Sequence, residues 1–153
     1  MQGFRKENSE STSEVLKMGI KIYLYALGIW LIFVVAGILN GAFRESFITP
    51  KVGEHTDHII STIILICVIL AVTHLFISNL KINYTETDLL LIGAFWTILT
   101  ILFEFGFGHY VIGHSWSELF ADYNILKGRV WSLVLLTTFT APSLIGYILK
   151  RWV

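Results

Sequence analysis

The sequence predicts an all-α integral membrane protein, a four-helix bundle, and three observations support this fold class. Of its 153 residues, 55% are hydrophobic and only 14% are charged, whereas soluble proteins average about 25% charged residues. The apolar residues gather into four long runs. None of these runs alternates strictly between apolar and polar residues, as membrane barrel strands do. Because only helices and closed barrels satisfy every backbone group in lipid, four helices follow.

Each apolar run is near the length of about 20 residues that a helix needs to cross the hydrocarbon core of a bilayer. Before the first run lies a polar segment of mixed charge, residues 1–17, which we expect to be an exposed tail. The rest, residues 18–153, is expected to form one domain. Its four spans are predicted at about residues 20–43, 59–77, 89–107 and 131–149.

A shorter amphipathic helix is expected between the third and fourth spans, within residues 115–126. Ser115 can cap this helix, with Glu118 three residues later as the second half of a capping box. The side chains that recur at helical spacing are Trp116, Leu119, Phe120 and Tyr123. This pattern is typical of a helix lying on the membrane surface. It either anchors and closes the end of the bundle or presents groups to a lipid headgroup or substrate.

The distribution of basic residues favours one orientation. An even number of spans places both termini and the middle connection on one side, which carries seven Lys and Arg residues against four on the other. Loops rich in Lys and Arg tend to remain cytoplasmic. We therefore expect a multi-pass protein of the cell (plasma or inner) membrane with both termini in the cytoplasm. The other two connections, residues 44–58 and 108–130, then face outward.

The charge balance of the chain indicates which classes of partner to expect. The 11 basic and 11 acidic residues give a net charge of zero, and without an overall basic field nucleic acid is not an expected partner. The lipid bilayer is the partner that the composition predicts. A homo-oligomer is a further expectation if the protein transports a solute, because four helices of this length leave little room for a pathway inside one protomer.

Polar residues of unusual kinds gather at the outer ends of the spans. We expect them to form an outward-facing polar pocket that binds a small polar ligand, an ion or a lipid headgroup. The candidate ligand-binding residues are Asn40, Arg44, Glu45, Glu54, His58, Glu104, His109, Asp122, Asn124 and Arg129.

Glu104 is the only carboxylate within an apolar run. At helical spacing it shares one stripe of the third span with small and hydroxyl residues, and such a stripe packs inward in a membrane bundle. The other members of the stripe are Gly93, Thr97, Thr100 and Gly108. Because a charge in hydrocarbon is costly, we expect a partner for Glu104: Arg44 first and Arg129 second. The pair could be only an interhelical clamp, or Glu104 could serve a ligand.

The first span carries a matching small-residue pattern. Gly37 and Gly41 form a small-x-x-x-small motif beside Asn40 and Arg44. Such motifs allow two membrane helices to approach closely. We therefore expect this face of the first span to pack toward the stripe that contains Glu104.

Four of the five histidines lie on the outer side, namely His55, His58, His109 and His114. Nitrogen and carboxylate ligands of this kind suit zinc or another first-row metal. The motif Glu54-His55-x-x-His58 differs in order from H-E-x-x-H, in which two histidines share a helix face. Exposed or capping histidines are the alternative interpretation. No other cofactor is predicted.

Several motifs at the outer ends resemble those of a group of small four-span prokaryotic membrane proteins to which no activity is assigned. The shared stretches are N-G-x-x-R-E, F-E-F-G-F-G-H-Y and D-Y-N-x-x-x-G-R-x-W, within residues 36–149. The resemblance implies the four-span architecture and supplies no reaction.

Three classes of function fit these observations. The first is a binding protein or transporter that uses the outer pocket. The second is a membrane-embedded, lipid-modifying enzyme with Glu104 or a histidine as general base. The third is a structural or assembly subunit in which Glu104 only forms a salt bridge. Neither a G-x-S-x-G elbow nor a phosphate-binding glycine loop occurs, which disfavours catalysis by a serine nucleophile or on a nucleotide.

Overall fold

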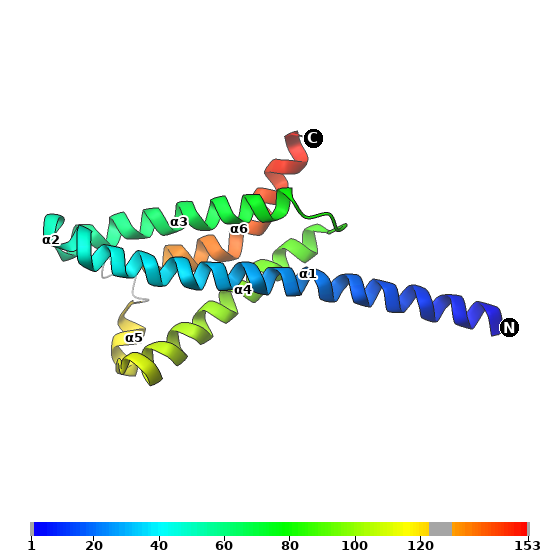
Figure 1. Cartoon of the computed structure of the whole chain (residues 1–153), viewed down its shortest axis with the longest axis horizontal. Helices are drawn as coiled ribbons and strands as arrows, with labels where there is room; N and C mark the ends of the chain where they lie inside the picture. Colours follow the sequence, from blue (N-terminus) through cyan, green and yellow to red (C-terminus); the bar gives the residue numbers. More distant parts are fainter. Residues whose placement is uncertain (1, 123–129, 153) are drawn as a thin grey trace.

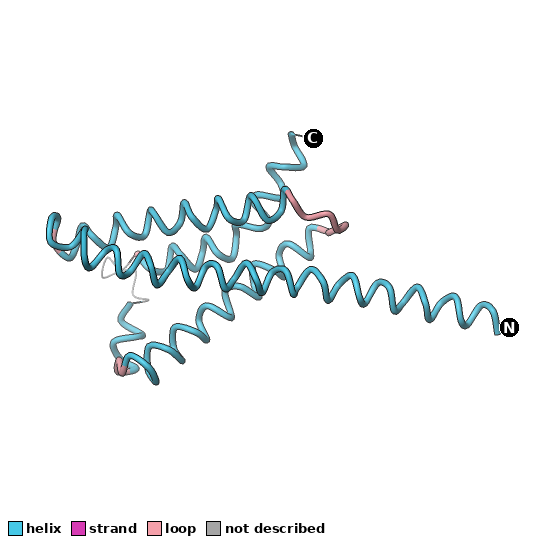
Figure 2. Tube along the Cα trace, viewed as in Figure 1, coloured by secondary structure: helices cyan, strands magenta, loops and turns pink. Residues whose placement is uncertain are grey.

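The protein is an all-α bundle with four helices that are long and apolar enough to cross a membrane, as the sequence predicts (Figure 1). The computed structural model describes the backbone of residues 2–122 and 130–152, and the side chains of residues 19–53, 56–117, 119–120 and 130–150. No strand occurs in these described ranges (Figure 2). The elements are α1 (Gln2–Phe43), η1 (Arg44–Ile48), α2 (Thr49–Val52), α3 (Glu54–Ser78), α4 (Glu86–Phe107), η2 (Gly108–Ile112), α5 (Trp116–Asp122) and α6 (Trp131–Trp152).

The first and third spans are longer than their apolar runs predict. The π-helical segments η1 and η2 continue α1 and α4 without a break, so the candidate spans extend through Val52 and Ile112. The backbone is also helical from Gln2, so the segment predicted as a tail continues α1 away from the other helices (Figure 1). The four candidate spans are Gly19–Val52, Thr56–Ser78, Glu86–Ile112 and Trp131–Lys150.

Local sequence signals set several helix ends. At the start of α4 the Thr85 hydroxyl accepts a hydrogen bond from the Asp88 amide, while the Asp88 carboxylate accepts one from the Thr85 amide. Directly after α2 and η2, Gly53 and Gly113 adopt φ values of 79° and 85°, which glycine reaches without steric cost. The helix predicted over 115–126 is present as α5; its last predicted residues, 123–126, lie outside the described residues.

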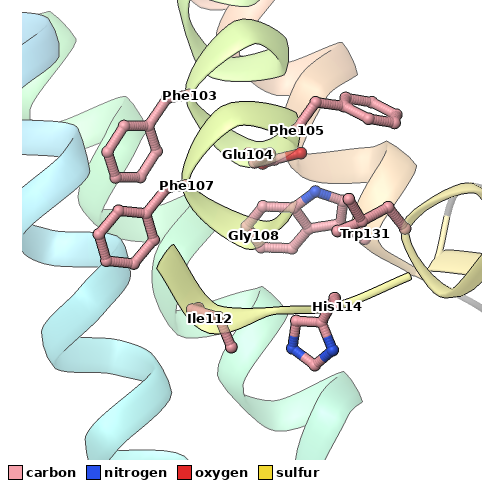
Figure 3. A pocket seen from close by; sticks show the side chains of 9 residues that line it. Phe103, Glu104, Phe105, Phe107, Gly108, Ile112, His114 and Trp131 are labelled. Carbon is pink, nitrogen blue, oxygen red and sulfur yellow. The ribbon is translucent and has the colours of Figure 1, made fainter. Parts of the chain in front are cut away.

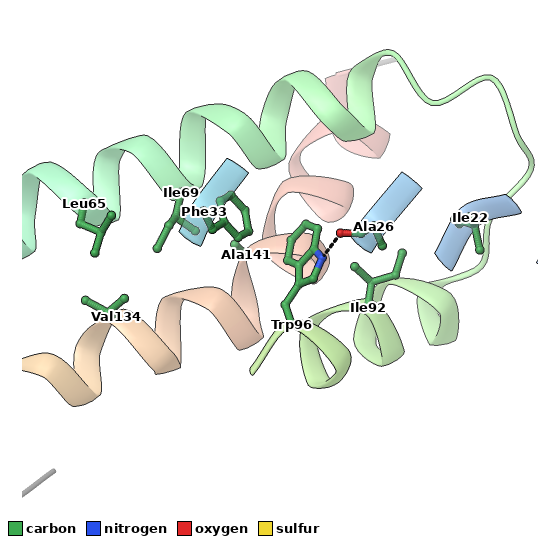
Figure 4. Close-up of a cluster of buried hydrophobic side chains, with 9 residues drawn as sticks. All are labelled: Ile22, Ala26, Phe33, Leu65, Ile69, Ile92, Trp96, Val134 and Ala141. Atoms are coloured by element: carbon green, nitrogen blue, oxygen red, sulfur yellow. Dashed lines mark hydrogen bonds between the residues drawn. The ribbon is translucent and has the colours of Figure 1, made fainter. Parts of the chain in front are cut away.

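The core lies between all four long helices and centres on Trp96 of α4. The Trp96 indole is fully buried, and its Nε1 donates a hydrogen bond of 2.7 Å to the backbone carbonyl of Ala26 in α1 (Figure 4). Phe33 packs its ring edge against the same indole, with centroids 4.9 Å apart. Because this hydrogen bond satisfies the only polar group of the indole, α1 and α4 are held in a fixed register.

Helices α4 and α6 approach each other most closely at two glycines. A Cβ on Gly93 would overlap the backbone carbonyl of Phe139, and one on Gly146 would overlap the side chain of Leu89. By contrast, a Cβ on Gly37 or Gly41 of α1 would meet no atom within 4 Å. The small-residue motif of α1 therefore makes no close helix contact, although Gly37 faces the stripe of Glu104 across a cavity that both residues border.

Candidate functional site

The described members of the predicted polar pocket lie in three places: one group joins the ends of α1 and α3, Glu104 lies on α4 next to η2, and His109 lies in η2, between α4 and α5. The single pocket stays a prediction, because four of its ten residues have side chains outside the described part of the chain. Each group has its own geometry and is described in turn.

Arg44, the first residue of η1, organises the group between α1 and α3. Its Nη1 donates a hydrogen bond of 2.9 Å to Nδ1 of His58, and its Nη2 lies 3.5 Å from Oε1 of Glu45. Its Nε lies 4.0 Å from Oδ2 of Asp57. The Thr49 hydroxyl is within hydrogen-bond distance of the same Asp57 oxygen, at 2.5 Å. The guanidinium of Arg44 therefore contacts side chains of its own hairpin, which α1 and α3 form.

Asp57 and Asn40 are the buried members of this group. The side chain of Asp57 is only 3% exposed, whereas that of Arg44 is 24% exposed. Asn40 Nδ2 donates a hydrogen bond of 3.1 Å to the backbone carbonyl of Ser61, one turn of α3 below Asp57. These contacts join α1 to α3 on successive turns, so the group acts as a polar clamp at the end of the first hairpin.

Glu104 belongs to an inward-facing stripe, as predicted, but Arg44 is not its partner, because the ion pairs of Arg44 are with Glu45 and Asp57. The stripe also faces more than one helix. Gly93 packs on α6, while the Thr100 hydroxyl accepts a hydrogen bond of 3.1 Å from Nε1 of Trp30 in α1. The half-buried Glu104 follows one turn further out.

Two cavities, each of about 220 Å³, adjoin at Glu104. The rim cavity lies beneath the η2–α5 turn, and Figure 3 shows the Glu104 carboxyl group there on the same side of α4 as Trp131. The deep cavity lies between all four spans. The walls common to both cavities are Phe103, Glu104, Phe107, Ile112 and Trp131. The rim cavity adds Phe105, Gly108, His114 and Leu119, and the deep cavity adds Trp30, Phe33, Val34, Gly37, Ile38, Leu65, Ile69, Thr100, Val134 and Thr138.

The walls of the deep cavity are mainly aromatic and aliphatic, and their polar groups are largely engaged. Thr100 donates its hydroxyl hydrogen to the backbone carbonyl of Trp96, and Thr138 donates its own to that of Val134, each at 2.8 Å. Trp30 Nε1 donates to Thr100. Glu104 contributes the one carboxyl group among the described walls of this cavity.

The described histidines of the predicted metal set lie in different parts of the molecule. His109 Nδ1 donates a hydrogen bond of 2.9 Å to the backbone carbonyl of His114, and its ring stacks on Trp116 with centroids 4.0 Å apart. His58 is bonded to Arg44 in the other hairpin. No group of three or more His, Cys, Asp or Glu side chains within the described part of the chain could hold a metal ion. The metal set expected from His55, His58, His109 and His114 is therefore not brought together by its described members.

Five predicted site residues cannot be placed by their side chains. The side chains of Glu54, His55 and Asp122 lie outside the described residues. Asn124 and Arg129 lie outside them entirely. Arg129 is the second expected partner of Glu104, so that expectation stays a prediction.

Sequence reasoning missed the aromatic walls and the role of Asp57. Phe103 and Phe107 flank Glu104 at a spacing of one helical turn, and this pattern could have indicated that the acid borders an aromatic surface. Asp57 directly precedes the second apolar run, next to His58. A carboxylate at the start of a span is a signal for a charged partner in the adjacent helix.

Fold and site together define a small four-span α-helical membrane protein with an intramembrane cavity that a carboxyl group borders. Comparison with known protein families, with curated proteins and with solved structures finds no match to this chain. The resemblance to small four-span prokaryotic proteins therefore stays an expectation that rests on the shared motifs alone.

Proposed function

We propose that this chain is a multi-pass membrane protein that binds a small ligand in the deep cavity, with Glu104 as the group that recognises the polar part of the ligand. The observation that carries the proposal is a cavity of about 220 Å³ bordered by all four spans and by one intramembrane carboxyl group. Ionisable residues at such positions are costly and commonly mark ligand or ion sites.

The rim cavity supports access from the outer side. It shares five wall residues with the deep cavity and continues to His114 and Leu119 at the η2–α5 turn. A ligand that enters beneath this turn reaches Glu104 before it reaches the middle of the bundle. If the ligand is carried across the bilayer, we expect a homo-oligomer to supply the remaining pathway.

The proposed setting is the cell membrane, with both termini in the cytoplasm. The seven-to-four distribution of basic residues supports this orientation. Single cysteines placed at Lys51 and at Lys81, in a background in which Cys67 is replaced by serine, test it. A membrane-impermeant maleimide added to intact cells should label the first position and not the second. The reverse pattern would overturn the orientation.

Two glycines of α1 provide a matched test of the cavity. Gly37 borders the deep cavity and Gly41 does not, yet a side chain at either position would meet no atom within 4 Å of its Cβ. Gly37→Leu should therefore occupy cavity volume without disturbing the helix packing, and Gly41→Leu is its control.

The measurement is quenching of tryptophan fluorescence in lipid nanodiscs, because Trp30 and Trp131 border the cavity. The probes are para-bromobenzyltrimethylammonium and its neutral carbon isostere, para-bromoneopentylbenzene, whose bromine quenches indole at short range. At least one probe should show saturable quenching in the unmodified protein and in Gly41→Leu, but not in Gly37→Leu. Unsaturable quenching by both probes, or no difference between the glycine variants, would overturn the proposed function.

A further inference from the structure

The deep cavity has a second opening besides the rim cavity. We infer that it opens sideways into the bilayer, between α1 and α4, and that its ligand is a compact, uncharged lipophile that enters from there. This inference rests on the proposed function and adds the route of entry and the chemical class of the ligand. It follows from the course of the two helices, the exposure of the cavity walls and the lining of the opening.

Helices α1 and α4 are joined in one half of the bundle and separate in the other. The hydrogen bonds between them that the structure describes run from Trp96 and Ala26 to Trp30 and Thr100. Toward the ends that carry η1 and η2 the two helices diverge (Figure 1). Two turns beyond Trp30, a Cβ on Gly37 would meet no atom within 4 Å, so α4 does not reach α1 at this level. The deep cavity lies in this gap, because it has walls on both helices.

The walls of the deep cavity are buried on one side and exposed on the other. Ile38 of α1 and Ile112 of η2 line the cavity and are 53% and 59% exposed. Among the described residues, the cavity is therefore closed toward α3 and α6 and open between α1 and the segment formed by α4 and η2. Four wall residues from α3 and α6 are at most 4% exposed, namely Leu65, Ile69, Val134 and Thr138.

The opening is lined by hydrocarbon. Figure 3 shows two of its phenylalanine rings projecting from the same side of α4. A charged molecule would lose its solvation in such a passage, whereas an uncharged lipophile that is already dissolved in the bilayer would not. This selection is the same whether the carboxyl group of Glu104 is protonated or ionised. The described edges of the opening are Val34, Ile38, Phe103, Phe107 and Ile112.

The ligand can still carry a polar group if that group is uncharged. A hydroxyl group both donates and accepts hydrogen bonds, so it can bond to a carboxyl group in either protonation state. Glu104 lies in the wall that the deep cavity shares with the rim cavity. An alcohol or phenol is therefore compatible with both the opening and the proposed role of Glu104.

The physics of transfer favours a compact ring over an acyl chain. Lipid tails are as apolar as the cavity, so transfer from the bilayer gains no hydrophobic free energy and binding depends on close packing. A flexible chain would lose conformational freedom in the cavity, while a rigid ring loses little. A chain is therefore at least as stable in the bilayer as in the cavity.

The cavity is also prearranged for a ring of modest size. Phe103 and Phe107 stack with centroids 5.1 Å apart, and the hydrogen bond from Trp30 to Thr100 fixes the orientation of the indole. An engineered apolar cavity of about 150 Å³ holds one benzene molecule. A cavity of about 220 Å³ therefore has room for one ring with a small substituent.

A first measurement tests the opening without any ligand. A nitroxide spin label is attached to the cysteine of Gly37→Cys, in a background with Cys67→Ser, and electron paramagnetic resonance in nanodiscs measures its collisions with oxygen and with a water-soluble nickel chelate. The reference is a label at Leu39→Cys, a position that is 64% exposed and not a cavity wall. Because the two positions differ by only about 3 Å along the helix axis, both collision rates should agree within about twofold. Low oxygen collisions at Gly37 would indicate a closed cavity and high nickel collisions a water-filled one, and either result would overturn the inference.

A second measurement tests the ligand class by tryptophan quenching in nanodiscs. The probes are the neutral ring para-bromoneopentylbenzene, the cation para-bromobenzyltrimethylammonium and the flexible chain 1-bromododecane. With affinities referred to the probe concentration in the bilayer, the neutral ring should bind at least about tenfold more tightly than either of the others. A preference for the cation or the chain, or no preference, would overturn the ligand class.

The failure of this inference differs from the failure of the proposed function. If the neutral ring is not preferred, a difference between Gly37→Leu and Gly41→Leu with any probe still supports the proposed function. If these two variants do not differ with any probe, the proposed function fails, and the collision rates at Gly37 still decide whether the cavity opens into the bilayer.

Discussion

The two hairpins of the bundle, α1 with α3 and α4 with α6, end their first helix in similar ways. In each, an α-helix passes into a five-residue π-helical segment, η1 or η2, and a glycine with positive φ, Gly53 or Gly113, follows before the chain returns. They differ in the use of their acidic residues. Asp57 contacts Arg44 and Thr49 within the first hairpin, whereas Glu104 borders the deep cavity, which residues of all four spans line.

Similar backbone ends therefore adjoin a polar clamp in one hairpin and a cavity with a carboxyl group in the other. In the first hairpin the charges lie between two adjacent helices and hold them together. In the second hairpin the carboxyl group lies one turn before the π-helical segment, beneath a cap of aromatic rings. Changes in the first hairpin should therefore mainly affect the free energy of unfolding, and changes at Glu104 should mainly affect binding.

The largest effect is expected from Arg44→Met. Loss of the guanidinium leaves the carboxylate of Asp57, whose side chain is 3% exposed, with Thr49 as its remaining side-chain hydrogen-bond partner among the described residues. Removing one member of an ion pair leaves the other charge uncompensated, and this is costly where that charge is buried, so the free energy of unfolding should fall by more than in the other variants. Titration with a denaturing detergent in mixed micelles measures it.

Two variants sharpen the interpretation of Arg44→Met. Glu45→Gln removes an exposed partner of the same guanidinium, and it should cost under about 1 kcal/mol. Adding Asp57→Asn to Arg44→Met removes the unpaired charge, so the double variant should be more stable than Arg44→Met alone. If the double variant were instead less stable than Arg44→Met, the ion pair would not be the source of the effect.

Gly53 and Gly113 should differ in how strongly a change to alanine destabilises the protein. Gly53 has φ 79° and ψ 163°, a region that is essentially restricted to glycine, while Gly113 has φ 85° and ψ 19°, in the left-handed helical region. Gly53→Ala should therefore destabilise the protein by about 2 kcal/mol and Gly113→Ala by about 1 kcal/mol. The same detergent titration compares them. Equal losses, or a larger loss at Gly113, would contradict the assignment of strain to the first hairpin.

The sequence was sufficient to predict the four spans and the inward direction of Glu104. Length and hydropathy decide whether a helix can cross a bilayer, and helical periodicity decides which residues share a face. The position of Thr100 on the stripe of Glu104 was correctly inferred on this basis, and its hydroxyl meets Trp30 across the bundle.

The partner of Arg44 and the cavity could not be predicted in the same way. Arg44 and Glu104 were matched by their depth in the membrane, but the partner of a charge depends on which helices are neighbours at that level. Arg44 lies against the start of α3, where Asp57 is closer in space. The cavity depends on how four helices cross, and no local pattern of Phe103 or Trp131 contains that information.

The smallest effect is expected at the cap of the second hairpin, from His109→Phe. Phenylalanine keeps a ring that can stack on Trp116 but loses the hydrogen bond to the carbonyl of His114. Because His114 is exposed, water can replace the lost donor, and the cost should be about 0.5 kcal/mol. His109→Ala also removes the stacked ring and should cost about 1 kcal/mol more. If His109→Phe were as destabilising as His109→Ala, the hydrogen bond rather than the stacked ring would hold the cap, and the second hairpin would depend on polar contacts as the first one does.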